Sequence, residues 1–247
     1  MNEVAAGKLI VALDYPSAEA AEKLLEELRG IPCYMKVGME LFYAAGPAFV
    51  ERLKRDGYRI FLDLKMHDIP NTVKGGARSI TSMGVDMFNV HAAGGLKMME
   101  AALQGVEAAR QAGTAQSEPV VIAVTQLTST DQRTLNEEIG IAGTVEEAVL
   151  HYASLTRRAG LHGVVASAHE VARIKAACGE AFITVTPGIR PQGADTGDQS
   201  RIMTPGEAIR QGTDYIVVGR PITAAPSPRQ AAEAIVAEMA SALTATR

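Results

Sequence analysis

Eight short apolar runs, rich in β-branched residues, recur along the chain and predict strands. Their hydrophobicity is nearly continuous, as expected for parallel strands that are covered on both faces. The predicted strands are residues 9–14, 34–37, 59–64, 87–91, 120–125, 163–166, 182–186 and 215–218. Longer stretches of helical period separate these runs. The pattern therefore predicts β and α elements in alternation.

Capping-box spacings indicate where several of the helices begin. In such a box a Ser or Thr and the Glu or Gln three residues later satisfy each other's backbone N–H groups. The spacing occurs at Thr144 with Glu147, Ser167 with Glu170, Thr204 with Glu207, and Ser227 with Gln230. Pro205 and Pro228 then occupy the first helical position, where a missing N–H costs nothing. Ser17 similarly precedes a helical stretch that Gly30 is expected to end.

Eight β/α repeats in 247 residues predict an α/β fold, a (β/α)8 TIM barrel that forms one domain over residues 1–247. A doubly wound open sheet is the alternative. The first strand, however, runs into Asp14-Tyr15-Pro16-Ser17 and lacks the Gly-rich fingerprint of such sheets. The least structured stretches, residues 126–143 and 187–203, follow strands on the side where barrel enzymes place active-site loops.

Composition and charge exclude several classes of protein. The formal net charge of −4, with no basic run, argues against a nucleic-acid binder. No apolar run reaches the roughly 18 residues that a membrane span needs, and the first residues lack the features of a signal peptide. Cys33 and Cys178 are too few for a disulfide framework or a zinc cluster, and one bridge between them is the minor alternative. We therefore expect a cytoplasmic protein.

Charged residues meet the C-terminal ends of the first three predicted strands. By the alternation of side chains along a strand, Asp14, Lys36 and the pair Asp63 and Lys65 point to one rim, and Asp68 follows in the loop. A charge that points into a parallel barrel is costly unless it is paired or functional. The pattern indicates either a structural salt-bridge network or an active site. Barrel enzymes place their chemistry at this rim, which favours the active site.

Residues 61–72 read FLDLKMHDIPNT, with the core D-x-K-x-x-D followed by I-P-x-T. This stretch resembles the signature of the orotidine 5'-phosphate decarboxylase family. Asp14 at the end of the first strand, Lys36 in MKVG, TPGIR at 186–190 and VVGRPI at 217–222 also match. These matches run along essentially the whole chain, in the family's order and spacing.

The resemblance implies conversion of orotidine 5'-phosphate to uridine 5'-phosphate and CO2, the last step of de novo pyrimidine nucleotide synthesis, with no metal or cofactor. It places Asp63 and Lys65 beside the pyrimidine carboxylate and the reacting carbon. Lys65 would donate the proton that replaces the carboxylate at C6. Lys36 and Asp68 would complete an alternating chain of charges. The resemblance also implies a homodimer in which Asp68 and Thr72 reach the neighbouring active site.

The resemblance further implies a set of substrate contacts. They are Asp14 and Lys36 at the ribose, Thr128 at the pyrimidine edge, Arg190, Gly219 and Arg220 at the phosphate, Gln199 at base and phosphate, and Asp63, Ile69, Thr72 and Pro187 elsewhere in the site. Loops after the seventh and eighth strands hold phosphate in many barrels. The polar, Gly-containing stretch 187–203 is typical of a lid that closes over the phosphate.

Two other functions fit parts of the pattern. A 3-keto-gulonate 6-phosphate decarboxylase of the same suprafamily also carries D-x-K-x-x-D, but it uses Mg²⁺ held partly by an acid on the second strand. Lys36 stands on that strand here, and an ammonium cannot ligate a hard cation. A non-catalytic phosphate-binding barrel should have lost one of the key charges, and all five are present. His67 is expected to face the loop, and His91 to be a neutral, orienting residue.

Overall fold

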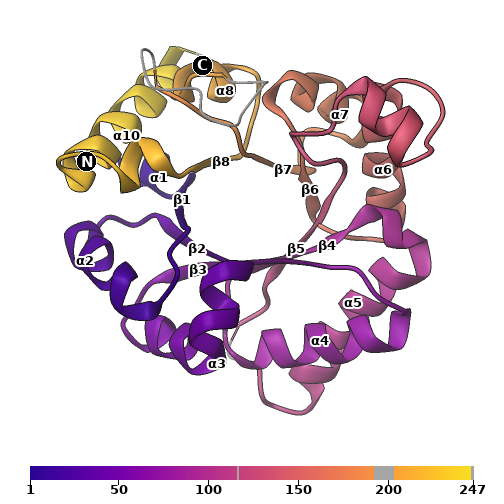
Figure 1. Ribbon diagram of the computed structural model, residues 1–247, viewed down its shortest axis with the longest axis horizontal. Helices are drawn as coiled ribbons and strands as arrows, with labels where there is room; N and C mark the ends of the chain where they lie inside the picture. Colours follow the sequence, from indigo (N-terminus) through magenta and orange to yellow (C-terminus); the bar gives the residue numbers. More distant parts are fainter. Residues whose placement is uncertain (116, 192–202, 246–247) are drawn as a thin grey trace.

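The computed structural model is a closed barrel of eight parallel strands with helices around it (Figure 1). It describes residues 1–115, 117–191 and 203–245. The strands are β1 (Leu9–Leu13), β2 (Tyr34–Gly38), β3 (Arg59–Met66), β4 (Met87–His91), β5 (Val120–Val124), β6 (Gly163–Val165), β7 (Ile183–Thr186) and β8 (Tyr215–Val218). Each strand pairs with the next in the sequence, and β8 pairs with β1 to close the barrel. The predicted (β/α)8 barrel is confirmed.

The helices form a ring outside the strands (Figure 1). The longer ones are α2 (Ala18–Leu28), α3 (Met39–Arg55), α4 (Pro70–Ser82), α5 (Gly95–Gln111), α6 (Val145–Arg158), α7 (Val171–Cys178), α8 (Pro205–Arg210) and α10 (Pro228–Ala245). Short helical segments are α1 (Glu3–Ala6), η1 (Ala92–Gly94), η2 (Thr134–Glu138), η3 (Ala168–Glu170) and α9 (Arg220–Thr223). None of the helices within the described ranges is long and apolar enough to cross a membrane.

Local side-chain chemistry begins these helices where the sequence predicts it. At Thr144 and Thr204 the Thr hydroxyl accepts the backbone N–H of the Glu three residues later, and that Glu carboxylate accepts the Thr backbone N–H. The Glu170 carboxylate accepts the backbone N–H of Ser167 at 2.9 Å. Pro205 and Pro228 are the first residues of their helices. The helices are therefore placed by signals that lie within a few residues of their starts.

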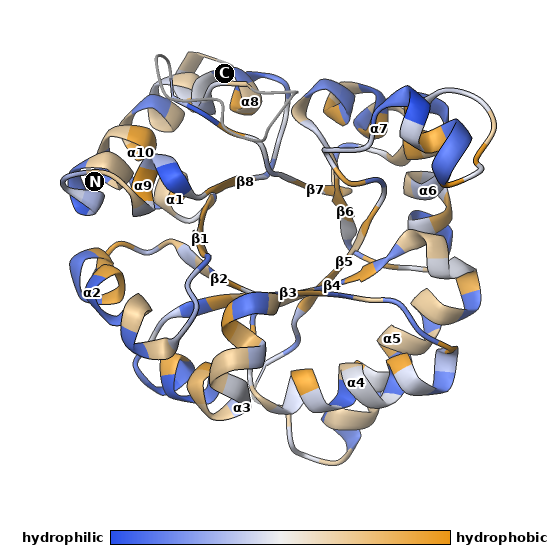
Figure 2. Ribbon diagram, viewed as in Figure 1, coloured by the Kyte–Doolittle hydropathy of each residue, from blue (hydrophilic) through white to orange (hydrophobic). Residues whose placement is uncertain are grey.

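Buried apolar side chains form three clusters, of which a small one lies among α6, β6 and α7. Figure 2 shows the hydropathy of each residue along the ribbon. A larger core between the barrel and the helices takes the outward-facing residues Leu9, Val11 and Leu13 of β1, among many others. A smaller core inside the barrel takes inward-facing residues from seven strands: Ile10, Ala12, Tyr34, Phe61, Met87, Ile122, Val185 and Val217. The middle of the interior is thus packed with apolar side chains. Cys33 and Cys178 are both buried and free.

The stretch 126–143 has more structure than the sequence predicts. It contains the π-helical turn η2. The Asn136 amide donates to the backbone oxygen of Gly143 at 2.9 Å, and the Gln132 amide donates to the same oxygen at 2.7 Å. Bonds between polar side chains and backbone hold this loop, and hydrophobic periodicity cannot reveal such bonds.

Helices α4 and α5 lie side by side and approach closely at Gly105 (Figure 1). A Cβ atom at Gly105 would lie 2.3 Å from the backbone oxygen of Lys74 and 2.8 Å from the Cβ of Ala77. Because the first of these atoms belongs to the backbone of another helix, it cannot turn away. We expect Gly105→Ala to lower the free energy of unfolding by roughly 1–3 kcal/mol, as overpacking does. Urea unfolding measured by circular dichroism tests this.

Gly75→Ala is the matched control, because Gly75 lies in α4 and a Cβ there meets nothing within 4 Å. The alanine should be neutral or stabilising, by up to about 1 kcal/mol, through its better helix propensity. Equal effects of the two substitutions would show that close packing at Gly105 does not matter.

Candidate active site

A cavity of about 350 Å³ opens at the C-terminal end of the barrel. Residues from all eight strands, or from the loops that follow them, line it. The inward-facing Phe61 and Val217 belong both to this lining and to the apolar core beneath it. The cavity therefore lies directly on the packed interior of the barrel, at the rim where barrel enzymes carry out their chemistry.

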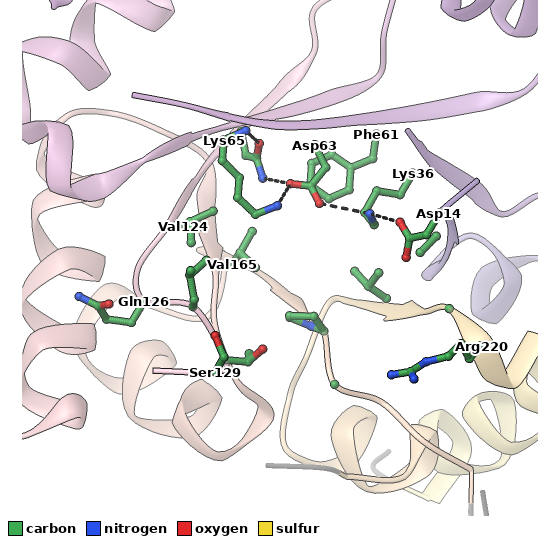
Figure 3. A pocket seen from close by; sticks show the side chains of 18 of the residues that line it. Asp14, Lys36, Phe61, Asp63, Lys65, Val124, Gln126, Ser129, Val165 and Arg220 are labelled. Atoms are coloured by element: carbon green, nitrogen blue, oxygen red, sulfur yellow. Dashed lines mark hydrogen bonds and ion pairs between the residues drawn. The ribbon is translucent and has the colours of Figure 1, made fainter. Parts of the chain in front are cut away.

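Four charged side chains form a continuous chain along one side of this cavity (Figure 3). The Lys36 ammonium lies 3.3 Å from a carboxylate oxygen of Asp14 and 3.3 Å from one of Asp63. The Lys65 ammonium lies 2.8 Å from the other oxygen of Asp63. Acid and base alternate along the chain. The structure thus brings together four of the five charged residues that the sequence singles out.

Asp63 is the buried centre of this chain. Burial by itself would raise the pKa of its carboxyl group, but the charges of Lys36 and Lys65 and the hydrogen bonds from Lys65 and Asn89 outweigh that cost. The pKa of Asp63 therefore lies below its ordinary value. The carboxylate keeps its negative charge in the cavity at neutral pH.

The backbone of β3 is irregular where it carries these groups. Lys65 has φ of 51°, the only non-glycine residue with positive φ among those described. The pairing of β3 with β4 shifts register between Leu62 and Met66. The sequence alternation is nevertheless preserved, because Asp63 and Lys65 both line the cavity while Leu64 packs on the outer core.

Asn89 is a member of the site that the sequence analysis did not find. It lies in β4, is 1% exposed and lines the cavity. Its amide donates to Asp63 at 2.7 Å and accepts the backbone N–H of Lys65 at 2.8 Å. The available signal was a polar residue in the otherwise apolar predicted strand MFNVH, on the same face as the inward Met87.

Cationic and polar residues line the opposite part of the cavity. Figure 3 shows Arg220 across the cavity from the charged chain. Arg190 follows β7 and is buried, and its guanidinium donates to the Ile189 carbonyl at 3.0 Å. Five residues that the family resemblance names as substrate contacts line this cavity: Thr128, Pro187, Arg190, Gly219 and Arg220.

Asp68, Ile69 and Thr72 do not line the cavity of their own chain. All three are exposed, and the side chain of Ile69 is among the most exposed large apolar ones described, at 67%. The Asp68 carboxylate accepts the backbone N–H of Ile69 at 2.6 Å. Gln199 and most of the predicted lid lie outside the described residues.

His67 and His91 lie next to each other at the rim, with ring centroids 5.6 Å apart. Burial, then the charges of His67 and Lys65, lower the pKa of His91 below its ordinary value. His91 is therefore neutral at physiological pH, as expected, and His67 is exposed. In the described part of the chain, no three His, Cys, Asp or Glu side chains are arranged to hold a metal ion.

The model of the "Orotidine 5'-phosphate decarboxylase / HUMPS family" matches residues 7–235. The chain belongs to this family. An orotidine 5'-phosphate decarboxylase of Moorella thermoacetica is 55% identical over 232 residues, which are 94% of this chain and 92% of that protein. One from Bacillus cytotoxicus is 53% identical over 227 residues, 92% of this chain and 94% of that protein.

Two solved structures resemble this chain over nearly its whole length, which agrees with its membership of the family. The orotidine 5'-phosphate decarboxylase of Lactobacillus acidophilus has a TM-score of 0.84 and 43% identity, covering 94% of this chain and 98% of that one. An uncharacterized conserved protein of Geobacillus kaustophilus has a TM-score of 0.82 and 46% identity, covering 94% and 99%. The family match and the structural matches therefore each cover nearly the whole chain.

Proposed function

We propose that this chain removes CO2 from orotidine 5'-phosphate and leaves uridine 5'-phosphate, the last step of de novo pyrimidine nucleotide synthesis. The observation that carries the proposal is the alternating chain Asp14, Lys36, Asp63 and Lys65 at the cavity of a family barrel. Because Cys33 and Cys178 are free thiols, we propose the cytoplasm as its location.

The reaction needs a positive group at the carbon that loses CO2. When the bond between C6 and the carboxylate breaks, its electron pair stays on C6. The Lys65 ammonium is proposed to stabilise this charge and then to give C6 the proton that replaces the carboxylate. Lys65 recovers its proton from solvent. The protein itself thus supplies what an electron-sink cofactor supplies elsewhere.

Asp63 is proposed to act on the ground state. Its carboxylate is held ionised beside the place of the substrate carboxylate, and the two negative charges repel each other. This repulsion disappears as CO2 leaves, so it favours the transition state over the bound substrate. Lys36 contacts both Asp14 and Asp63, so it is proposed to orient Asp63 and to bind the ribose together with Asp14.

The remaining contacts are proposed to hold the parts of the substrate that do not react. Arg190 and Arg220 offer guanidinium forks and Gly219 a backbone N–H to the phosphate. Thr128 is proposed to bind the pyrimidine edge and Pro187 to pack in the site. Gln199 is proposed to contact base and phosphate. Binding energy from these remote groups supports the reaction at C6.

A homodimer is part of the proposal. Asp68 and Thr72 are exposed and absent from their own cavity, which suits residues that complete a neighbouring site. The exposed apolar side chain of Ile69 lies between them in the sequence. Burial of such a side chain in a subunit interface would stabilise the dimer.

Turnover without a metal ion separates this function from its nearest alternative, the Mg²⁺-dependent sugar-phosphate decarboxylases. Lys36 lies between two carboxylates, where its ammonium occupies the position that a cation would need. We expect the ultraviolet absorbance of orotidine 5'-phosphate to fall with no cofactor added, at the same rate in EDTA. Strict dependence on Mg²⁺, or turnover of 3-keto-gulonate 6-phosphate in place of the nucleotide, would contradict the proposal.

A further inference from the structure

The irregular part of β3 faces a single residue of β4. Leu62 pairs with Phe88 and Met66 pairs with Val90, so residues 63–65 of β3 lie opposite Asn89 alone. Asp63 and Lys65 are both in this segment. Asn89 is therefore the one β4 residue placed to support the backbone that carries them.

One end of the Asn89 side chain holds the backbone of Lys65. The register of β3 and β4 shifts between Leu62 and Met66, the segment that contains Lys65. The side-chain oxygen Oδ1 of Asn89 accepts the Lys65 backbone N–H at 2.8 Å. Lys65 is in the left-handed conformation, with φ of 51°, which a residue with a side chain adopts only when its surroundings impose it. The bond to Asn89 is such a constraint.

The other end of the side chain holds Asp63. The Asn89 amide nitrogen donates to the Oδ1 atom of Asp63 at 2.7 Å, and the Lys65 ammonium donates to the same oxygen at 2.8 Å. The two contacts also determine how the amide is oriented, because its oxygen must face the N–H and its nitrogen the carboxylate. The amide thus links Asp63 to the backbone of Lys65.

We propose that Asn89 is a positioning residue for the decarboxylation, because its amide fixes the Asp63 carboxylate and the Lys65 backbone relative to each other. This inference rests on the proposed roles of Asp63 and Lys65. It assigns to Asn89 no contact with substrate. Its effect is on where the ammonium and the carboxylate stand when C6 loses CO2.

Asn89→Leu removes both hydrogen bonds and keeps the branched shape of the side chain. We expect kcat for orotidine 5'-phosphate to fall on the order of 10²-fold, the effect of a misplacement of about 1 Å. KM should change by less than about threefold, because Arg190 and Arg220 are untouched. Thr156→Val is the matched control: Thr156 is fully buried on α6 and its hydroxyl donates to the Tyr152 carbonyl, far from the cavity. Its kcat should stay unchanged.

Asn89→Asp gives a readout that a purely structural role would not move. A protonated carboxyl group at this position can donate to Asp63 and accept from Lys65 N–H, as the amide does. Burial and the negative charge of Asp63 raise the pKa of the new group, the ammonium groups of Lys65 and Lys36 beside Asp63 act in the opposite direction, and the neutral His91 adds no charge. As pH rises, the group ionises and two carboxylates face each other.

We therefore expect kcat of Asn89→Asp to be best at low pH and to decline at a lower pH than in the unmodified enzyme. Because each pH profile is expressed relative to the maximum rate of the same protein, this test also answers the question if Asn89→Leu fails to fold. A kcat of Asn89→Leu within threefold of the unmodified enzyme, or an unchanged pH profile for Asn89→Asp, would overturn the inference. An unmodified protein that does not decarboxylate the substrate would instead overturn the proposed function.

Discussion

Lys65→Ala is expected to reduce kcat/KM for orotidine 5'-phosphate by about 10⁴-fold or more, because the substitution removes both the proposed general acid and the charge proposed to stabilise C6. The ammonium lies 2.8 Å from Asp63 in the wall of the cavity. Without it, the carboxylate of Asp63 would face the substrate carboxylate with less compensation. The loss should appear mainly in kcat, since the interaction develops in the transition state.

The measurement is the fall in ultraviolet absorbance of orotidine 5'-phosphate, together with calorimetric titration of uridine 5'-phosphate. Some nucleotide binding should persist, because the proposed phosphate contact Arg220 lies across the cavity from Lys65. Lys23→Ala is the control: the side chain of Lys23 on α2 is 89% exposed, and its loss should leave the rate unchanged. A Lys65→Ala variant with a near-normal rate would refute the proposed role.

Mixing subunits is expected to restore activity to two inactive variants. If Asp68 serves the neighbouring site, Asp68→Ala and Lys65→Ala homodimers are each inactive. In a hybrid dimer, one site combines an intact Lys65 from one chain with an intact Asp68 from the other. After random exchange of equal amounts, about a quarter of all sites should be intact in a two-fold symmetric dimer.

The structural basis is the location of Asp68, which is exposed and bonded to the Ile69 N–H, away from the cavity of its own chain. Mixing Lys65→Ala with Asp63→Ala is the control. Both residues line the same cavity, so no hybrid can contain an intact site. Full activity of Asp68→Ala alone, or no recovery after proven subunit exchange, would show that Asp68 does not act across a dimer.

The local part of this structure follows from the sequence alone. Strands in a closed parallel barrel are buried on both faces, so they appear as short apolar runs that turn signals separate. The capping boxes at Thr144 and Thr204 depend only on residues three apart. The alternation of side chains also predicts that Asp63 and Lys65 share a face, and both line the cavity.

The charge of Lys36 was equally informative. A lysine on the second strand, within a barrel that carries D-x-K-x-x-D, predicts an ammonium next to carboxylates. The structure places it between Asp14 and Asp63. The sequence is sufficient to predict this contact because strands that are adjacent in the barrel are also consecutive in the chain. The C-terminal ends of β1, β2 and β3 can therefore be placed side by side without the three-dimensional structure.

The register between β3 and β4 was decided by the tertiary structure. Asn89 lies 24 residues from Lys65, and the periodicity of β4 says only that it faces inward. The register shift that leaves Asn89 alone opposite residues 63–65, and the left-handed Lys65 within it, arise from long-range pairing. The position of Asp68 outside the cavity of its own chain also comes from the folded structure, because the sequence shows only that Asp68 follows β3 in the loop.

The barrel, its rim and the charges that meet there can be predicted from the amino-acid sequence, because strand burial, helix caps and side-chain alternation act over a few residues. How those charges are held depends on the folded chain, because the amide of Asn89 reaches both Asp63 and Lys65 through a strand pairing that no local pattern encodes.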